Sequence, residues 1–334
     1  MKVLVCGGCG FIGSSFIRNS LEKNSFDHIY NLDSLTIGSN KKNLEKFETN
    51  TNYTFIHDDI KNNSILNKLV PDVDVVINFA AESHVDRSIS NPKPFIETNI
   101  LGTYNILEAI RKFEKFFVHV STDEVYGDAQ DDESYTEHSE IKPSNPYSAT
   151  KAASDHLVNS YHRTYGINCI TTRCSNNFGP YQFPEKLIPK TIIRAIKNLK
   201  IPLYGDGNQI RSWIYVDDHV NAIDLLLRKG ISGEIYNITS YHEISNKIIV
   251  KKILSLLDKS DDQIEFVTDR PGHDKRYSID SSKIENEIKW NPTYDFDTAL
   301  EKTVNWYMEN KFWWEPLIDE KVLHPQPWTL NWSK

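Results

Sequence analysis

Three glycines near the start of the chain restrict the possible folds more than any other feature. Gly7, Gly10 and Gly13 follow the apolar run Val3–Cys6 and lead into the helix-like segment Ile12–Glu22. Glycines at this spacing permit a tight turn between a strand and a helix, where the backbone can approach a bound group closely. Strand-like and helix-like segments continue to alternate after it, as in a parallel sheet with helices on both faces. The sequence therefore predicts an α/β fold with a doubly wound parallel sheet.

An acidic residue after the second predicted strand, Ile29–Leu32, indicates the ligand. Asp33 lies about 20 residues after Gly13, where a carboxylate accepts hydrogen bonds from a ribose diol and repels a 2′-phosphate. This arrangement favours NAD over NADP, although a glycine turn by itself can be purely structural. The residues predicted to hold NAD are those of the loop and of two later strand ends, namely Gly7, Gly10, Phe11, Ile12, Gly13, Asp33, Asp59 and Ile60.

The distribution of prolines and glycines divides the chain at about Ser175, because loops and shorter elements replace the regular alternation there. We expect a Rossmann-type NAD-binding domain over residues 1–175, to which a later segment, about 209–240, returns. A smaller α/β portion over residues 176–334 is expected to bind mainly the substrate. The other elements predicted in the first domain are strands at Tyr53–His57, Val73–Phe79, Phe116–Ser121 and Ile167–Arg173 and helices at Asn99–Lys115 and from Pro146 onward.

Tyr147 and Lys151 form a pair suited to hydride transfer. They are four residues apart and share one face of the predicted helix. A neighbouring ammonium is expected to lower the pKa of the phenol, so that Tyr147 can take a proton from a substrate hydroxyl as hydride leaves. Lys151 can also hold the nicotinamide ribose. The pair alone is common on protein surfaces, but the upstream glycine loop makes an oxidoreductase site the better interpretation.

Two adjacent carboxylates, Asp123 and Glu124, follow the predicted strand Phe116–Ser121. A plain oxidoreductase has no obvious use for them, and such a pair is often only a solvated acidic turn. An enzyme that oxidises a sugar, eliminates water and reduces the product needs both an acid and a base. Mutual repulsion and unequal burial can separate the pKa values of two carboxyls in this way. The sequence therefore favours a dehydratase over a simple dehydrogenase.

Composition excludes several other classes of function. A net charge of -8 argues against a surface that binds duplex nucleic acid. No apolar run approaches the roughly 20 residues that span a bilayer, and Val3–Cys6 leads directly into the glycine loop without room for a signal peptide. We therefore expect a cytoplasmic protein with no membrane partner. Cys6 and Cys9 are interpreted as packed small side chains, and no metal site is predicted.

The chain resembles the extended short-chain dehydrogenases/reductases that act on nucleotide sugars, and within them the nucleoside-diphosphate-glucose 4,6-dehydratases. The specific element is Ser-Thr-Asp-Glu-Val-Tyr-Gly (121–127), because related epimerases and decarboxylases typically lack its acidic pair. The other motifs that carry the resemblance are at 7–13, 80–88, 146–151, 176–189 and 270–277.

The resemblance implies a role for each catalytic residue. Thr122 and Tyr147 would handle the hydroxyl on sugar carbon 4 while NAD takes the hydride. Glu124 would remove the proton on carbon 5, and Asp123 would protonate the hydroxyl leaving carbon 6, to which the hydride then returns. The product would be a 4-keto-6-deoxyglucose derivative, commonly an intermediate of rhamnose synthesis.

The resemblance also implies binding residues. Ala80 and Ala81 would contact the cofactor, and Ser83 the sugar. The nucleotide and its diphosphate would be bound by Asn176, Lys186, Leu187, Arg211, His273 and Arg276. Ser212 stands where bacterial dTDP-glucose enzymes commonly carry Asp, so both dTDP-glucose and UDP-glucose stay open as substrates.

The same fold could serve three other functions, and the family resemblance also implies an oligomeric state. A nucleotide-sugar 4-epimerase or a UDP-glucuronate decarboxylase would leave Asp123 and Glu124 unexplained, and a non-catalytic NAD-binding scaffold or sensor would have no need of Tyr147 and Lys151. The resemblance implies a homodimer through a four-helix interface formed by Asn99–Lys115 and Tyr147–Tyr165. The apolar residues offered there are Ile100, Tyr104, Leu107, Leu157 and Tyr161.

Overall fold

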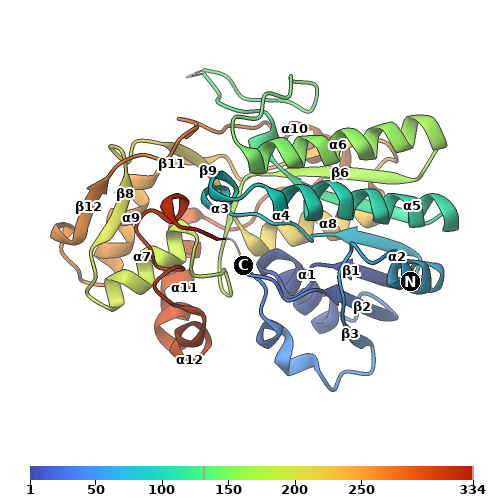
Figure 1. The fold of residues 1–334 in the computed structure, drawn as a ribbon, viewed down its shortest axis with the longest axis horizontal. Coiled ribbons are helices and arrows are strands. Elements are labelled where there is room, and N and C mark those ends of the chain that lie inside the picture. Colours follow the sequence, from blue (N-terminus) through green and yellow to red (C-terminus); the bar gives the residue numbers. More distant parts are fainter. Residues whose placement is uncertain (131, 333–334) are drawn as a thin grey trace.

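A seven-stranded parallel sheet forms the centre of the computed structural model, which describes residues 1–130 and 132–332 (Figure 1). The strand order is β10-β6-β5-β4-β1-β2-β3, so the direction of winding reverses between β1 and β4. Ligands of such sheets bind at this reversal, outside the carboxyl ends of the strands. The predicted α/β fold is confirmed. The strands are β1 (Lys2–Cys6), β2 (His28–Asp33), β3 (Tyr53–His57), β4 (Val75–Asn78), β5 (Phe116–Thr122), β6 (Cys169–Cys174) and β10 (Ile235–Ile238).

Both faces of this sheet are covered by helices, which explains the continuous apolar runs of its inner strands. Alternate residues of β1 point to opposite sides: Val3 and Val5 belong to one buried cluster and Leu4 to the other. The first side is covered by α1 (Phe11–Glu22) and α8 (Val216–Lys229). The second is covered by α2 (Asn63–Leu69), α5 (Thr103–Phe113) and α6 (Pro146–Tyr165).

The helix predicted at Asn99–Lys115 begins earlier than expected and is irregular. It consists of α4 (Lys93–Phe95), a π-helical stretch at Ile96–Gly102 and α5. The buried side chain of Asn99 lies in the π-helical stretch, where it accepts a hydrogen bond from the Glu82 backbone N–H and donates one to Thr150. This bulge therefore ties the helix to α6 and to the segment after β4, which ends in α3 (Val85–Ser90).

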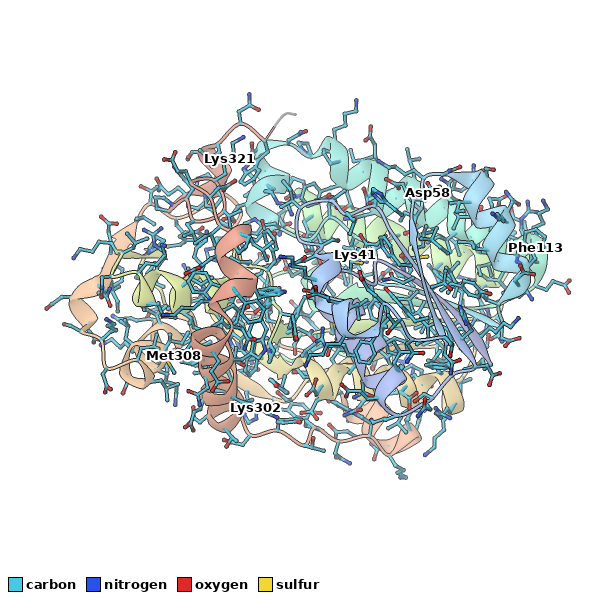
Figure 2. All side chains as sticks on the ribbon, turned by 90° about the horizontal axis from the view of Figure 1, so that it is seen from below. Lys41, Asp58, Phe113, Lys302, Met308 and Lys321 are labelled. Atoms are coloured by element: carbon cyan, nitrogen blue, oxygen red, sulfur yellow. The ribbon has the colours of Figure 1, made fainter. Side chains whose placement is uncertain are left out.

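The C-terminal portion contains two small sheets. The first has the order β11-β9-β7, and the second pairs β8 with β12. The bounds are β7 (Asn176–Phe178), β8 (Ile201–Tyr204), β9 (Ile210–Tyr215), β11 (His242–Ser245), β12 (Ile264–Val267), α7 (Leu187–Ile196), α9 (Asn246–Leu256), α10 (Ser282–Ile288), α11 (Phe296–Glu309) and α12 (Lys311–Trp314). Charged side chains such as Lys302 and Lys321 lie at the outer surface of this portion (Figure 2).

The segment predicted to return to the main sheet does so only in part. Helix α8 packs against α1, and β10 pairs with β6 in the central sheet. Strand β9 instead pairs with β7 and β11, because the chain turns away from the main sheet directly after β6. Residues 333 and 334 of the predicted second portion lie outside the described chain. None of the described helices combines the length and apolar character needed to cross a bilayer.

Candidate active site

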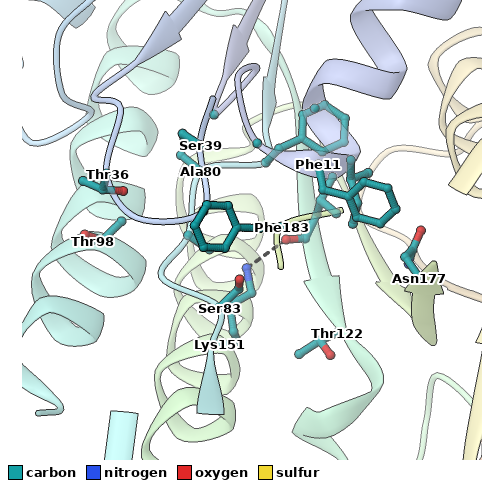
Figure 3. A pocket seen from close by; sticks show the side chains of 18 of the residues that line it. Phe11, Thr36, Ser39, Ala80, Ser83, Thr98, Thr122, Lys151, Asn177 and Phe183 are labelled. Carbon is teal, nitrogen blue, oxygen red and sulfur yellow. Dashed lines mark hydrogen bonds between the residues drawn. The ribbon is translucent and has the colours of Figure 1, made fainter. Parts of the chain in front are cut away.

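A deep pocket opens at the carboxyl ends of the central strands, where the winding reverses. It is lined by every residue predicted to hold the cofactor, including Ala80, Ala81, Tyr147 and Lys151. Figure 3 shows Thr122 and Lys151 lying on one side of this pocket, with Ala80 and Ser83 nearby. The sequence prediction thus named cofactor residues that the fold brings together from five separate segments of the chain.

The glycine loop packs so closely against its own backbone that Gly7 and Gly13 have no room for a side chain. Gly7 has φ +78°, and a Cβ atom there would lie 2.5 Å from the Ala80 backbone nitrogen. A Cβ atom at Gly13 would lie 2.4 Å from the Gly7 carbonyl oxygen. No side chain of the described residues caps the start of α1 at Gly10. Its first backbone N–H groups are therefore directed at the pocket, where they suit a pyrophosphate.

Asp33 is held in a fixed orientation at the end of β2. One carboxylate oxygen accepts a hydrogen bond from the Cys9 N–H and the other from the Leu35 N–H, each at 2.8 Å. Burial raises the pKa of Asp33, whereas these two backbone hydrogen bonds lower it. A buried, oriented carboxylate beside the glycine loop fits the ribose diol of NAD and disfavours the 2′-phosphate of NADP. The residues present therefore fit NAD.

The acidic pair occupies two different environments at the end of β5. Thr122 begins a short 3₁₀ turn by accepting a hydrogen bond from the Glu124 N–H, and its hydroxyl donates to Asp123 at 3.2 Å. Asp123 is only 2% exposed, and burial together with the charge of Glu124 raises its pKa to about 8. Glu124 is partly exposed and lines the pocket. The fold therefore supplies one carboxyl that is protonated at neutral pH beside a more accessible one.

The helix that carries Tyr147 and Lys151 is firmly anchored at its start. Asn145 and Ser148 form a reciprocal capping box around Pro146, which occupies the first helical turn. The Lys151 ammonium donates to the Val120 carbonyl at 2.8 Å, and burial lowers its pKa to about 8. Both side chains therefore lie at the carboxyl end of β5.

The expectation that Lys151 lowers the pKa of Tyr147 is wrong, because the pKa of this phenol is raised. Burial raises the pKa of Tyr147 well above its ordinary value, and the charge of Glu124 raises it further; a hydrogen bond with Thr122 acts in the opposite direction. The phenolate is disfavoured because little water reaches the hydroxyl and the nearest strong charge is negative. The position of Tyr147 and Lys151 on one helix face did not predict the burial of the phenol or the effect of Glu124 on its pKa.

A buried ionic cluster lies one helical turn beyond Lys151. Asp155 accepts a hydrogen bond from Arg173 Nε at 2.9 Å, and His119 Nε2 lies 3.5 Å from its other oxygen. Arg173 also donates to the Tyr126 hydroxyl, which donates to Asn237 on β10. The cluster thus connects α6 to β5, β6 and β10 directly beneath the catalytic residues.

A second pocket adjoins the first and shares Glu124, Asn176 and Lys186 with it. It contains three further residues predicted to bind the substrate, Leu187, Arg211 and His273, whereas Ser83 lines the first pocket. Because Glu124 faces both pockets, a molecule in the second would reach the catalytic end of the first.

The structure does not place Arg276 at either pocket. Its guanidinium forms a two-fold ion pair with Glu243 and donates to the carbonyls of Gln130 and Glu133. These bonds occupy the donors that a diphosphate would need. Arg270, six residues earlier in the same motif, lines the second pocket instead and donates to Asp86 at 2.9 Å.

Sequence reasoning missed several residues of the second pocket, among them Asp86, Lys190, Tyr204, Arg270 and Tyr277. Asp86, Arg270 and Tyr277 carried a signal, because they lie in the motifs at 80–88 and 270–277. Ser212, whose identity leaves the nucleotide base open, is buried and hydrogen-bonded to Thr239, and it does not line the second pocket.

Asp123→Asn is expected to change how stability depends on pH. The pKa of Asp123 is about 8 in the fold against 3.8 for the unperturbed group, so folding takes up a proton between these values. The free energy of unfolding of the wild type therefore falls as pH rises through that interval. The substitution should be stabilising relative to wild type at about pH 8 and nearly neutral at about pH 4, measured by urea unfolding. Glu301→Gln, on the exposed face of α11, is the control, and equal pH slopes for wild type and Asp123→Asn would contradict the assignment.

Comparisons with known proteins agree with this geometry. The family model described as GDP-mannose 4,6 dehydratase matches residues 4–303. The dTDP-glucose 4,6-dehydratase of Escherichia coli is 44% identical, with 96% of this chain and 97% of that protein covered. The low-salt glycan biosynthesis protein Agl12 of Haloferax volcanii is 48% identical over 92% of this chain and 99% of its own.

Solved structures of a dehydratase and of an epimerase are both similar to this chain. DesIV, the dTDP-glucose 4,6-dehydratase of Streptomyces venezuelae, crystallised with NAD and TYD bound, has a TM-score of 0.93 at 44% identity, covering 95% of this chain and 100% of its own. UDP-glucuronic acid 4-epimerase from Bacillus cereus, in complex with UDP-glucuronic acid and NAD, has a TM-score of 0.88 at 29% identity, covering 92% and 99%. The dehydratase is thus the more similar of the two.

Proposed function

Since the chain belongs to the family that the GDP-mannose 4,6 dehydratase model describes, we propose that its two pockets carry out the 4,6-dehydration of a nucleoside-diphosphate glucose. The protein is an NAD-dependent hydro-lyase that forms the 4-keto-6-deoxyglucose derivative. The observation that carries this function is the placement of Asp123, buried and protonated at neutral pH, beside the partly exposed Glu124 where the two pockets meet. An epimerase would need neither carboxyl.

The cofactor site holds NAD through the glycine loop, Asp33 and Lys151. When bound, NAD supplies a reversible hydride acceptor. Tyr147 takes the proton from the hydroxyl on carbon 4, assisted by Thr122, and Lys151 positions the ribose. Because burial and the charge of Glu124 raise the pKa of Tyr147, the phenol needs a positive charge nearby to take this proton, and NAD would supply one when bound.

The two carboxyls perform the elimination. Glu124 removes the proton on carbon 5, which the ketone at carbon 4 has made acidic. Asp123 gives its proton to the hydroxyl leaving carbon 6, and its pKa of about 8 keeps that proton available at neutral pH. Each positioned proton transfer contributes roughly 10²- to 10⁴-fold to the rate.

The second pocket binds the nucleoside diphosphate. Lys186 and Arg211 line it and provide the positive charge that a diphosphate requires, whereas the charge of Arg270 is paired with that of Asp86. Asn176 and Leu187 are assigned to the nucleotide, and His273 to the base or ribose. We expect the thymidine carrier to be accepted, because relatives named for dTDP-glucose match nearly the whole chain. The uracil carrier lacks one methyl group, a difference worth only about 1–3 kcal/mol in a pocket.

The NAD-loaded protein is expected to convert dTDP-glucose, UDP-glucose or both into products that have lost one water. Both substrates are offered separately at equal concentration, and the products are identified by mass spectrometry and by the methyl group newly formed at carbon 6. Tyr147→Phe, which keeps the shape of the site, serves as the inactive control. Recovery of a galactose-type isomer without water loss would reassign the protein to the epimerases.

A homodimer is also part of the proposal. Two of the residues expected in its interface, Leu107 and Tyr161, are buried in the core of the subunit. Tyr104, which was also expected there, is exposed, and so are Ile96, Leu101 and Tyr165 on the same helices. A four-helix interface built on this surface would cover them. A cytoplasmic location and a role in forming rhamnose precursors rest on the family resemblance alone.

A further inference from the structure

The segment 322–332, which we call the C-terminal strap, contacts four elements that line the second pocket. It lies outside residues 4–303, which the family model matches. In Figure 1 it runs beside α3 and α7. We infer that the strap is a built-in brace of the nucleotide pocket and that Trp328 is a positioning residue for Tyr204. The inference rests on the proposed function in that it takes this pocket to bind a nucleoside diphosphate.

The strap is joined to α7 and α3 through its backbone. Lys190, a buried residue of α7 that lines the pocket, donates to the His324 carbonyl at 3.1 Å. Arg194, one turn later, donates to the Leu323 carbonyl. At the other end of the strap, the Ser90 hydroxyl of α3 donates to the Leu330 carbonyl. The strap therefore connects two helices that come from opposite parts of the chain.

The side chain of Trp328 supports one wall of the pocket directly. Its ring meets Tyr204 edge to face, with the ring centroids 4.7 Å apart and the planes at 84°. The Tyr204 hydroxyl donates to Asp86 at 2.8 Å, and Asp86 also accepts from Arg270. Tyr204, Asp86 and Arg270 all line the pocket. Trp328 itself does not line it, so it can act on a ligand only through Tyr204.

The segment that leads to Arg270 is attached to the strap as well. Gln326 donates to the Thr268 carbonyl at 3.3 Å, two residues before Arg270. The strap thus touches α3, α7, β8 and the segment after β12, and each of these contributes residues to the pocket. Asp86 already joins three of these elements, since it accepts hydrogen bonds from Tyr204 and Arg270, and the strap adds contacts that include α7. A brace that orders them before the ligand arrives lowers the entropy lost on binding.

Trp328→Ala should weaken nucleotide binding without disturbing the chemistry or the cofactor. Loss of one edge-to-face aromatic pair is expected to weaken the affinity by about 2- to 10-fold. We therefore expect the Kd for thymidine diphosphate and for uridine diphosphate, measured by calorimetry on the NAD-loaded protein, to rise by that factor. The KM for the converted nucleotide sugar should rise in parallel, with kcat and bound NAD unchanged. Trp328→Phe should restore most of the affinity.

Two comparisons separate positioning from a general loss of structure. Phe312→Ala removes an aromatic ring near the same end of the chain. This ring is 70% exposed, so its removal should leave Kd and KM unchanged. In a Tyr204→Ala background, Trp328→Ala should cause no further loss of affinity, because the Trp ring acts through the Tyr ring.

The inference would be wrong if Trp328→Ala bound nucleotide with wild-type affinity. It would also be wrong if Trp328→Ala caused the same loss of affinity with and without Tyr204. A fall in bound NAD and kcat together with affinity would overturn it too, since the effect would then be structural. Failure of the proposed function has a different signature, namely wild-type protein that binds the nucleoside diphosphates but converts neither nucleotide sugar.

Discussion

Asp123→Asn and Glu124→Gln are each expected to lower turnover by about 10²- to 10⁴-fold, but to stop the reaction after the first oxidation rather than before it. In the proposed mechanism both carboxyls act on carbons 5 and 6, whereas the oxidation at carbon 4 belongs to Tyr147 and Thr122. Each variant should therefore accumulate reduced cofactor when substrate is added, which the absorbance of the reduced nicotinamide reports.

Isotope exchange distinguishes the two carboxyl roles. Glu124→Gln should block the entry of solvent deuterium at carbon 5, because no base remains to remove that proton. Asp123→Asn should impair the loss of the carbon 6 hydroxyl more than the oxidation, because the amide cannot give up a proton as the buried carboxyl does. Deuterium at carbon 5 is measured by mass spectrometry of recovered sugar.

Tyr147→Phe is the matched control for both variants. It removes only the hydroxyl that takes the first proton, so it should lower turnover without accumulation of reduced cofactor. Wild-type turnover in both carboxyl variants would show that the pair has no part in the chemistry. Accumulation of reduced cofactor in Tyr147→Phe as well would mean that the first step is assigned to the wrong residue.

Asp155→Ala is expected to lower the free energy of unfolding by about 3–5 kcal/mol, because it leaves the Arg173 guanidinium buried without its counter-ion. Arg173 is 2% exposed, so water cannot replace the lost carboxylate. Burial by itself would raise the pKa of Asp155, but the hydrogen bond from His119 and the charge of Arg173 hold it at about 2. The carboxylate is thus ionised at neutral pH, and the ion pair is present throughout the usual working range.

The measurement is urea unfolding at neutral pH, followed by far-ultraviolet circular dichroism. Asp224→Ala is the matched control, since it breaks an ion pair with Arg228 on the surface of α8 and should change stability by no more than about 1 kcal/mol. A loss in Asp155→Ala no larger than in this control would mean that the buried cluster does not hold α6 in place.

Most residues of the cofactor site could be predicted from patterns of nearby residues in the sequence. The turn at Gly7–Gly13 needs residues without side chains, and the strands around it are buried on both faces, so that glycine spacing and apolar runs were sufficient to locate them. The residues at the ends of β1, β2, β4 and β5 then meet at one edge, because parallel strands in a sheet all point the same way. This is why residues as distant as Asp33 and Lys151 could be assigned to one pocket.

The residues that face the substrate were predicted less accurately from the sequence. Arg276 and Arg270 belong to one motif, and both are suited to phosphate by chemistry. Which of them faces the pocket depends on Glu243 and Asp86, which bind one guanidinium each from distant parts of the chain. The family resemblance likewise implied an interface that includes Leu107 and Tyr161, but both side chains are buried in the core of the subunit.

The sequence by itself determined the strand–turn–helix at the glycine loop and the parallel sheet, because these depend on local backbone geometry and on periodicity. The reacting side chains are a proposal that the family resemblance supports. Only the tertiary structure decided the pKa of Tyr147, the position of β9, the choice between two arginines and the course of the C-terminal strap. Burial and partner charge arise between segments far apart in the chain, and no spacing along the sequence encodes them.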